Sequence, residues 1–257
     1  MSFFKVIIPN YNSEKYINDC ISSILRQTYD NFEIVIVDDM STDASPALIK
    51  EIKDDRIHFI QNDRKRYNGG SRNVGIDYPI ESEYTLFIDN DDVFASDDCF
   101  EELHKAILDN NRPDLINLDY IYDDGTKHYI KLERNDPSTL VHDNNVACWT
   151  KCIKSELMVH FPENTLMEDV SQHIEQIDKI QTIYSINKAF VVWNRKNINS
   201  CSANPSEKRK SSEWRQLADV YDLELVHDYC KEERENRIKE YLDILLSGNH
   251  VWKELSR

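Results

Sequence analysis

Glycine is scarce, with five residues in a chain of 257, and no internal repeat or low-complexity segment is present. This excludes collagen-like and disordered architectures, and 40% hydrophobic with 30% charged residues is typical of a globular protein. Long apolar runs are also missing, since TLFI (85–88) and AFVVW (189–193) end well short of the roughly 18 residues that span a membrane. The first ten residues, MSFFKVIIPN, contain too short an apolar run for a signal peptide, so we expect a cytoplasmic protein.

Cysteines are few and lie without CxxC spacing, which argues against a disulfide framework or a zinc site. Two of them fall on the apolar faces of predicted helices, so we expect small, buried, unreactive thiols. The six positions are Cys20, Cys99, Cys148, Cys152, Cys201 and Cys230.

Three common site motifs are absent. The glycines at 69, 70 and 75 do not match GxGxxG, and the segment lacks the Lys-Ser/Thr of a P-loop. None of the eight histidines pairs at metal-ligand spacing or forms an evident Ser/His/Asp arrangement. Dinucleotide oxidoreductases, P-loop ATPases and hydrolases with a catalytic triad therefore lose support.

The charge balance is strongly acidic, with 47 Asp and Glu against 31 Lys and Arg and a formal net charge of -16. Such a chain repels polyanions, so nucleic acid is not an expected partner.

Apolar runs and amphipathic segments alternate at short spacing over the first hundred residues. This pattern predicts an α/β fold with a mostly parallel, Rossmann-like sheet flanked by helices. Further helices are expected from residue 99 and from about Asp169. The predicted strands are 4–8, 33–37, 57–60 and 85–88, with weaker signals at 115–118 and 190–193.

Polar residues begin where three of these strands end, and in open α/β sheets that edge binds ligands. The first strand runs into Pro9, Asn10, Tyr11 and Asn12, where the tyrosine could stack on a base. The second runs into Asp38 and Asp39, which could bind a ribose or a ring edge.

The fourth strand ends in Asp89-Asn90-Asp91-Asp92. Carboxylates at Asp89 and Asp91 can point into one cleft, where a divalent cation would relieve their repulsion, and Mg²⁺ or Mn²⁺ is often held by one or two carboxylates. The alternative is an acidic turn that caps the following helix.

Two further segments have a functional and a structural interpretation. Residues 69–75, GGSRNVG, follow Arg64, Lys65 and Arg66, and we expect a loop whose backbone approaches a diphosphate; the alternative is a surface turn. Glu168 and Asp169 open a helix, where the helix dipole alone also favours acids.

Taken in order, these segments resemble the family 2 inverting glycosyltransferases with a GT-A fold, of the kind that builds bacterial cell-surface glycans. The resemblance covers roughly residues 3 to 202. It includes PNYN (9–12), VDD ending at Asp39, GGSRNVG, FIDNDD, MED ending at Asp169, and Trp193-Asn194-Arg195 with Ser200 further on.

The resemblance implies a donor site for a nucleotide sugar, expected to be UDP-linked, and a divalent metal. Asp91 would coordinate the metal, with Asp89 nearer the ribose or sharing the ion, and Asp169 would be the general base. Glu168, Trp193 and Arg195 would contact the acceptor, a hydroxyl of a glycan or lipid-linked saccharide. The other donor-site residues would be Pro9, Asn10, Tyr11, Asn12, Asp38, Asp39, Gly70, Arg72 and Asn90.

We expect a donor-binding half (1–95) and an acceptor-binding half (96–204) of one domain, followed by a helical extension (205–257) that lies outside the resemblance and is inferred from its charge and apolar pattern. The extension carries apolar residues near helical spacing, which suit docking on the catalytic domain, a homodimer contact, or peripheral contact with the inner face of a membrane.

The chain departs from the family pattern where many relatives have a His and a Gly before the Ser. It carries Asn197 and Asn199 instead, so a role for that His is unsupported. Residues 120 to 165 match no pattern that identifies the acceptor.

Two other functions remain open. A sugar-nucleotide pyrophosphorylase would need a Gly-rich basic loop directly after the first strand, where this chain has PNYN. A non-catalytic module that binds a nucleotide sugar or a partner protein is the second.

Overall fold

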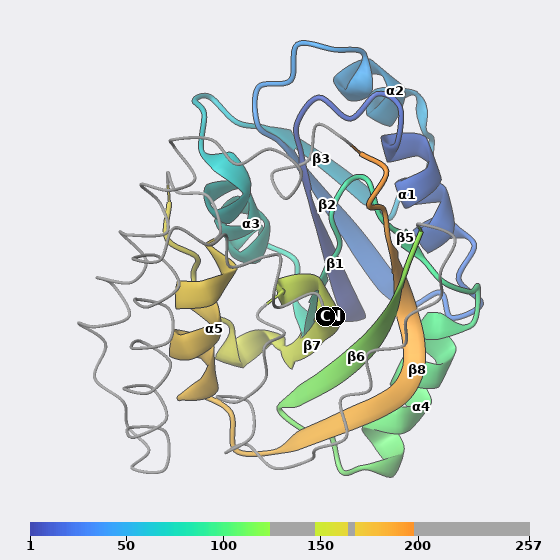
Figure 1. Ribbon diagram of the computed structural model, residues 1–257, viewed down its shortest axis with the longest axis vertical. Helices are drawn as coiled ribbons and strands as arrows, with labels where there is room; N and C mark the ends of the chain where they lie inside the picture. Colours follow the sequence, from blue (N-terminus) through green and yellow to red (C-terminus); the bar gives the residue numbers. More distant parts are fainter. Residues whose placement is uncertain (124–146, 164–167, 198–257) are drawn as a thin grey trace.

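The computed structural model describes residues 1–123, 147–163 and 168–197, which form three layers with one mixed sheet in the middle (Figure 1). The sheet has eight strands in the order β3-β2-β1-β4-β7-β6-β8-β5. The predicted extension (205–257) lies outside the described residues, as do residues 124–146 and 164–165 of the expected acceptor-side loops (about 120–165).

Four parallel strands make up one half of the sheet, as the sequence predicts. Helices cover both faces of this half, which explains why its strands are continuous apolar runs instead of alternating patterns. The carboxyl ends of these strands meet at one edge. Their bounds are β1 Ser2–Asn10, β2 Phe32–Asp38, β3 Ile57–Gln61 and β4 Ser82–Phe87.

The other half is mixed, so the expected parallel arrangement holds for the first four strands and for four of the seven strand pairings in the sheet. β7 (Lys151–Lys154) runs antiparallel to both β4 and β6 (Leu115–Tyr122), while β6 and β8 (Ile183–Trp193) are parallel. The two-residue β5 (Val93–Phe94) pairs antiparallel with β8. β7 and β5 escaped prediction because they are too short to show a period. Two 3₁₀ turns, Cys148–Thr150 and Ser155–Leu157, flank β7.

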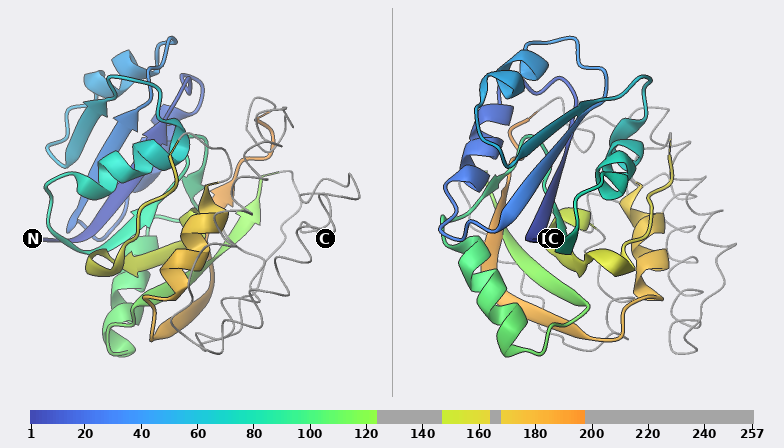
Figure 2. Two further views of the ribbon diagram at one scale, coloured as in Figure 1. Left: turned by 90° about the vertical axis from the view of Figure 1, so that its left-hand side faces the viewer. Right: turned by 180° about the vertical axis from the view of Figure 1, so that it is seen from behind.

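One face of the sheet is covered by α1 (Ile17–Leu25), α2 (Ser45–Glu51) and α4 (Cys99–Asp109), seen from two further sides in Figure 2. Their apolar residues enter the main core together with the matching face of the strands. The helix residues in this core include Ile17, Ile21, Ile24, Ile49, Phe100, Leu103 and Ile107.

The opposite face is covered by α3 (Tyr67–Asp77) and α5 (Asp169–Ile177). The glycine-rich segment 69–75 therefore lies inside a helix and is not the loop that the sequence suggested. Helix α5 begins at Asp169 as predicted.

The glycines of α3 allow close packing. A Cβ on Gly75 would lie 2.5 Å from Cγ2 of Ile7 in β1, and one on Gly69 would lie 2.6 Å from the carbonyl oxygen of Pro162. Both distances are shorter than real Cβ contacts, so only glycine fits.

Cys20, Cys99, Cys148 and Cys152 are buried and free, in agreement with the sequence. Burial raises the pKa of all four thiols. Cys201 and Cys230 lie outside the described residues. Among the helices described here, none is both long and apolar enough to cross a lipid bilayer.

Replacing Gly75 by Ala should lower the free energy of unfolding by about 1–3 kcal/mol, because the added methyl group overpacks the contact with Ile7. In a helix position without such a contact the same change would stabilise the protein by up to about 1 kcal/mol. The sign of the change in urea denaturation therefore tests the close approach of α3 to β1, and a stabilised variant would contradict it.

Candidate active site

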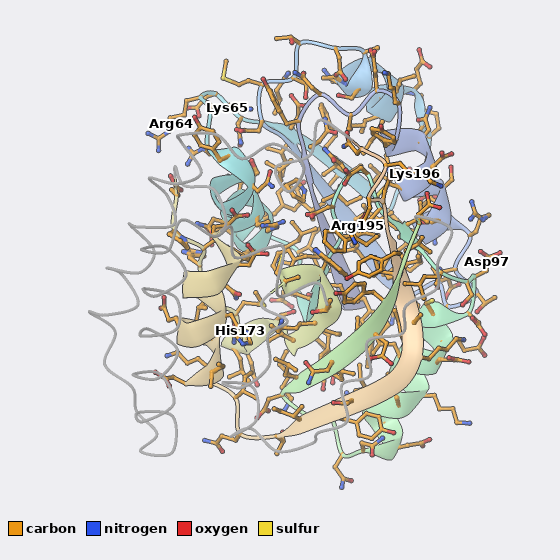
Figure 3. The ribbon with its side chains drawn as sticks, viewed as in Figure 1. Arg64, Lys65, Asp97, His173, Arg195 and Lys196 are labelled. Atoms are coloured by element: carbon orange, nitrogen blue, oxygen red, sulfur yellow. The ribbon has the colours of Figure 1, made fainter. Side chains whose placement is uncertain are left out.

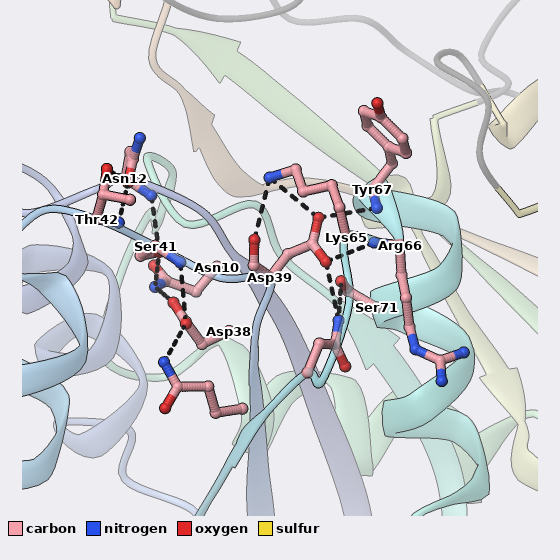
Figure 4. A network of polar contacts seen from close by, with 12 residues as sticks. Asn10, Asn12, Asp38, Asp39, Ser41, Thr42, Lys65, Arg66, Tyr67 and Ser71 are labelled. Atoms are coloured by element: carbon pink, nitrogen blue, oxygen red, sulfur yellow. Dashed lines mark hydrogen bonds and ion pairs between the residues drawn. The ribbon is translucent and has the colours of Figure 1, made fainter.

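Asp38 lies at the end of β2, and its carboxylate is hydrogen-bonded to other groups of the protein. It accepts hydrogen bonds from Asn10 Nδ2 at 2.7 Å, from the backbone N–H of Ser41 at 3.1 Å and from Gln61 Nε2 at 3.2 Å. Asp38 and Asn10 are both buried, so they hold the ends of three neighbouring strands together (Figure 4). Pro9 is likewise buried in β1.

The Asp39 carboxylate organises the start of α3. It accepts the backbone N–H groups of Arg66 at 2.7 Å and Tyr67 at 2.8 Å, and the side-chain amide of Asn62 at 3.0 Å (Figure 4). Lys65 Nζ lies 3.1 Å from the same carboxylate. These four contacts match the acceptor capacity of a carboxylate. Contact between Asp39 and a ligand therefore requires displacement of one of them.

Tyr11 is exposed beside this network, with Lys65 Nζ 2.8 Å from the centre of its ring. Asn12 follows with a φ of 48° and fixes the β2–α2 loop, since it accepts from Thr42 N at 2.8 Å. A pocket of about 410 Å³ opens between residues 11–16, Asp43, Asn90 and Asn197. Tyr11, Asn12 and Asn90 thus border one open space, unlike the buried Asn10 and Asp38.

The DNDD turn follows β4, and its carboxylates have different surroundings. Asp91 is half-buried, and its burial and the nearby Asp89 raise its pKa to about 6. Asp92 is fully buried. Its pKa lies well above the usual value, mainly because of this burial and secondly because of the negative charge of Asp91.

Two residues after β8 hold this turn and were missed by sequence reasoning. Asp92 Oδ1 accepts the backbone N–H of Asn194 at 2.8 Å, and Asp91 Oδ2 accepts Asn197 Nδ2 at 2.6 Å. About a hundred residues separate the partners, so no local signal could have revealed the contact. It places the end of β8 over the carboxyl edge of β4.

Arg72 in α3 connects the two acidic parts of the site. Its Nη2 lies 2.7 Å from Asp89 Oδ1, and its Nη1 is hydrogen-bonded to Glu168 Oε1. The side chain is 2% exposed. Gly70 is also buried in α3, so this face of the helix is not an open ligand surface.

Glu168 and Asp169 stand at the start of α5. Burial raises the pKa of Glu168 to about 7, although Arg72 opposes the shift. Burial likewise raises the pKa of Asp169, with Arg72 opposing and Asp89 adding to the effect. A carboxylate with a raised pKa suits proton transfer.

Trp193 and Arg195 flank Asn194, whose backbone N–H contacts the DNDD turn at the end of β8. Trp193 belongs to an aromatic cluster with Tyr120, Tyr122 and Trp149, at centroid distances of 5.4 to 6.1 Å from Trp193. The guanidinium of Arg195 lies over Tyr122 and Trp193 at 4.9 and 5.6 Å. Figure 3 shows Arg195 beyond the end of β8, apart from Arg64 and Lys65 near α3.

The described residues include no group of three or more His, Cys, Asp or Glu that could hold a metal alone. Asp89 and Asp91 nevertheless fit a divalent cation, because the charge of Asp89 destabilises the ionised form of Asp91 and a cation would reverse that effect. Mg²⁺ and Mn²⁺ often take only one or two protein carboxylates and complete their shell with substrate phosphates and water.

A nucleotide-binding type of sheet with paired carboxylates at its carboxyl edge is the architecture of the GT-A class. Residues 5–173 match the family described as Glycosyl transferase family 2, and the chain belongs to this family. The protein is therefore a glycosyltransferase.

The chain is homologous to glycosyltransferases of bacterial cell-surface polysaccharides. It is 29% identical over 189 residues to an uncharacterized glycosyltransferase of Haemophilus influenzae, covering 70% of this chain and 74% of the relative. It is 24% identical to the Escherichia coli UDP-Glc:alpha-D-GlcNAc-diphosphoundecaprenol beta-1,3-glucosyltransferase WfgD. The match covers 87% of this chain and 88% of the relative. It spans only 32% of the length of glycosyltransferase GlyA of Streptococcus pneumoniae.

Two solved structures share the fold. The structure of S. aureus TarS 1–349 in complex with UDP-GlcNAc has a TM-score of 0.77 at 21% identity, covering 96% of this chain and 73% of that one. The Pyrobaculum calidifontis mannosyltransferase PcManGT, in complex with GDP-Man and Mn²⁺, has a TM-score of 0.62 at 15% identity, covering 95% and 70%.

Replacing Asp39 by Ala should lower the free energy of unfolding by about 1–3 kcal/mol, because two backbone N–H groups at the start of α3 and the buried Asn62 amide lose their acceptor. Asp63→Ala is the matched control, since that carboxylate is 83% exposed and pairs with Arg66 at 3.6 Å. Its effect should stay below about 0.5 kcal/mol. Equal losses in chemical denaturation would contradict the special role of Asp39.

Proposed function

We propose that this glycosyltransferase moves a sugar from a UDP-linked donor to a hydroxyl of a glycan or lipid-linked saccharide, with inversion and with the help of a divalent metal. The observation that carries the proposal is the arrangement around Arg72. Its guanidinium contacts both the acidic turn after β4 and the acidic start of α5, through partners 17 and 96 residues away along the chain. Arg72 thereby brings the proposed leaving-group site and the start of the helix that carries the proposed base close together.

The donor base is proposed to stack on Tyr11, whose ring is exposed beside Asp39. A uracil ring has an N–H that Asp39 can accept once Lys65 moves away from its carboxylate. Pro9 and Asn10 shape the floor from β1, while Asn12 and Asn90 border the open pocket. The UDP moiety is supported by the UDP-Glc donor in the name of WfgD and by the UDP-GlcNAc bound to TarS.

Asp91 and Asp89 are the residues proposed to hold Mn²⁺ or Mg²⁺. When bound, the metal supplies a positive charge that stabilises the diphosphate leaving group. The PcManGT complex, which contains Mn²⁺ together with GDP-Man, supports this choice. Asn197, which borders the pocket, donates a hydrogen bond to Asp91 and so restricts the orientation of its carboxylate.

Asp169 is proposed as the general base. The acceptor oxygen attacks the anomeric carbon, its proton passes to the Asp169 carboxylate, and the bond to the diphosphate oxygen breaks on the opposite side, which inverts the configuration. A raised pKa makes Asp169 a stronger proton acceptor than an ordinary aspartate.

The acceptor is proposed to bind between Glu168 and the end of β8, near Trp193 and Arg195. Aromatic rings pack well against sugar faces, and the Arg195 charge suits a diphosphate such as that of a lipid-linked saccharide. Such an acceptor would place the enzyme at the cytoplasmic face of a membrane. The division into a donor half (1–95) and an acceptor half (96–204) remains part of this proposal.

The two rival functions have less support. A pyrophosphorylase needs a basic glycine-rich loop after β1, and the glycine-rich segment here is helix α3. A non-catalytic module would bind a nucleotide sugar without turnover.

Donor turnover tests the proposal directly. Purified protein should release UDP from one nucleotide sugar with Mn²⁺ or Mg²⁺, and EDTA should abolish the release. Asp91→Ala should reduce kcat by about 100-fold or more because leaving-group stabilisation is lost. Asp169→Asn should reduce transfer by a similar factor while nucleotide binding persists.

Asp97→Ala is the control variant, since this exposed carboxylate pairs only with Arg26 in the described contacts and should leave kcat unchanged. Tight, metal-dependent nucleotide binding without turnover of any donor and acceptor would favour the module. Absence of nucleotide binding would overturn the proposed donor site.

The pH dependence provides a second test. If Asp169 is the base, it must be ionised, so kcat at saturating donor and metal should fall on acidification. Because the pKa of Asp169 lies above the ordinary 3.8, the fall should begin at a higher pH than for an ordinary aspartate. A kcat that stays flat until the protein unfolds would argue against this base.

A further inference from the structure

The Arg72 side chain is buried and therefore shielded from a ligand that arrives from solvent. Its side chain is 2% exposed, and two of its nitrogens are engaged by Asp89 and Glu168. The guanidinium also faces the ring of Phe161, with 5.3 Å between the guanidinium carbon and the ring centre. Its Nε is buried without a hydrogen-bond partner among the described residues. The guanidinium therefore has no open face for a phosphate.

The carboxylates depend on this arginine in turn. Glu168 is 3% exposed, and burial of an unpaired carboxylate is strongly unfavourable. Arg72 is the cation that touches it, so the position of Glu168 follows the position of α3.

Other α3 residues hold the chain that leads to Glu168. Asn73 donates its amide to the carbonyl of Phe161 and accepts the N–H of the same residue, both at 2.8 Å. Gly69 lets the carbonyl oxygen of Pro162 and the Glu168 side chain approach α3 closely. Both ends of the segment that precedes α5 are therefore fixed to one face of α3.

The first turn of α5 is built directly on Glu168. Its carbonyl oxygen accepts the N–H of Gln172 at 3.2 Å, and Asp169 is the next residue along the chain. A shift of Glu168 would move the Asp169 backbone with it.

We infer that Arg72 is a positioning residue that fixes Asp169 relative to the DNDD turn through Glu168 and Asp89, instead of contacting the donor as the family resemblance implies. This inference rests on the proposed function. The strut formed by Asp89, Arg72 and Glu168 sets the distance between the leaving-group site and the base. Loss of the strut impairs the chemical step more than donor binding.

The experiment compares wild type, Arg72→Lys, Glu168→Gln and the double variant. Lysine keeps the charge but cannot bridge two carboxylates as the planar guanidinium does, and glutamine keeps the shape of Glu168 without its charge. Three quantities are measured: kcat for donor turnover, the Kd of UDP with Mn²⁺, and amide hydrogen exchange of residues 168–177.

Each single variant should lose at least about 10-fold in kcat, with a change in Kd below about threefold. The double variant should lose no more kcat than the worse single variant, because both changes break one strut. Exchange in 168–177 should accelerate in all three variants.

Asp54→Asn is the matched control, because it removes a carboxylate that pairs with Arg56 at 2.8 Å just before β3, at the opposite end of the strands from the edge that forms the site. It should leave kcat and the exchange of 168–177 unchanged. Glu168→Gln preserves volume and serves as the test if Arg72→Lys does not fold.

Two results would contradict the strut and favour a contact between Arg72 and the donor. One is an Arg72→Lys variant that loses as much UDP affinity as kcat. The other is a double variant whose loss in kcat equals the product of the two single losses. Unchanged exchange in 168–177 would also overturn the strut. If wild type neither binds UDP nor turns over a donor but the variants accelerate exchange, the proposed function fails and the strut stands.

Discussion

The candidate site depends on how closely α3 lies against the sheet and against the segment before α5. Gly75 allows the helix to touch Ile7 of β1, and Gly69 allows it to touch Pro162. This closeness is what lets Arg72 and Asn73 reach both the turn after β4 and the chain that leads into α5. A larger residue at either glycine would separate the helix from one of its neighbours. The glycines are thus required for close packing of α3, and this packing in turn allows the ion pairs of Arg72.

The carboxyl edge of the sheet gathers many acids, and the structure treats them differently. Asp38 and Asp39 accept hydrogen bonds from amides and backbone N–H groups, which makes them parts of the scaffold. Asp91, Glu168 and Asp169 are less well compensated, since burial raises the pKa of each despite its polar contacts. Carboxylates in this state gain most from a cation, a proton or a substrate group. Asp38 and Asp39 therefore stabilise the structure of the site, whereas Asp91, Glu168 and Asp169 are suited to binding a cation or transferring a proton.

Lys65 lies beside the first of these groups. Its ammonium contacts the Tyr11 ring and the Asp39 carboxylate, so it covers the surface where a base is proposed to stack. Donor binding there would exchange an internal ion pair for contacts to the ligand. Lys65 therefore lies at the proposed base site, and Arg64 and Arg66 pair with Glu163, whereas the sequence pattern had suggested that these basic residues contact a diphosphate.

The sequence alone determined the parallel half of the sheet, because strands buried on both faces must be apolar throughout and their helices must be amphipathic. It also determined that acids follow β2 and β4 and open α5, since polar residues after a buried strand are local and visible. The tertiary structure decided the rest. β7 and β5 are too short for a periodic signal, and α3 is glycine-rich for packing reasons that appear only when Ile7 and Pro162 lie beside it. Whether Arg72 meets a ligand or two carboxylates depends on partners 17 and 96 residues away, and long-range pairing of this kind has no signature in the local sequence.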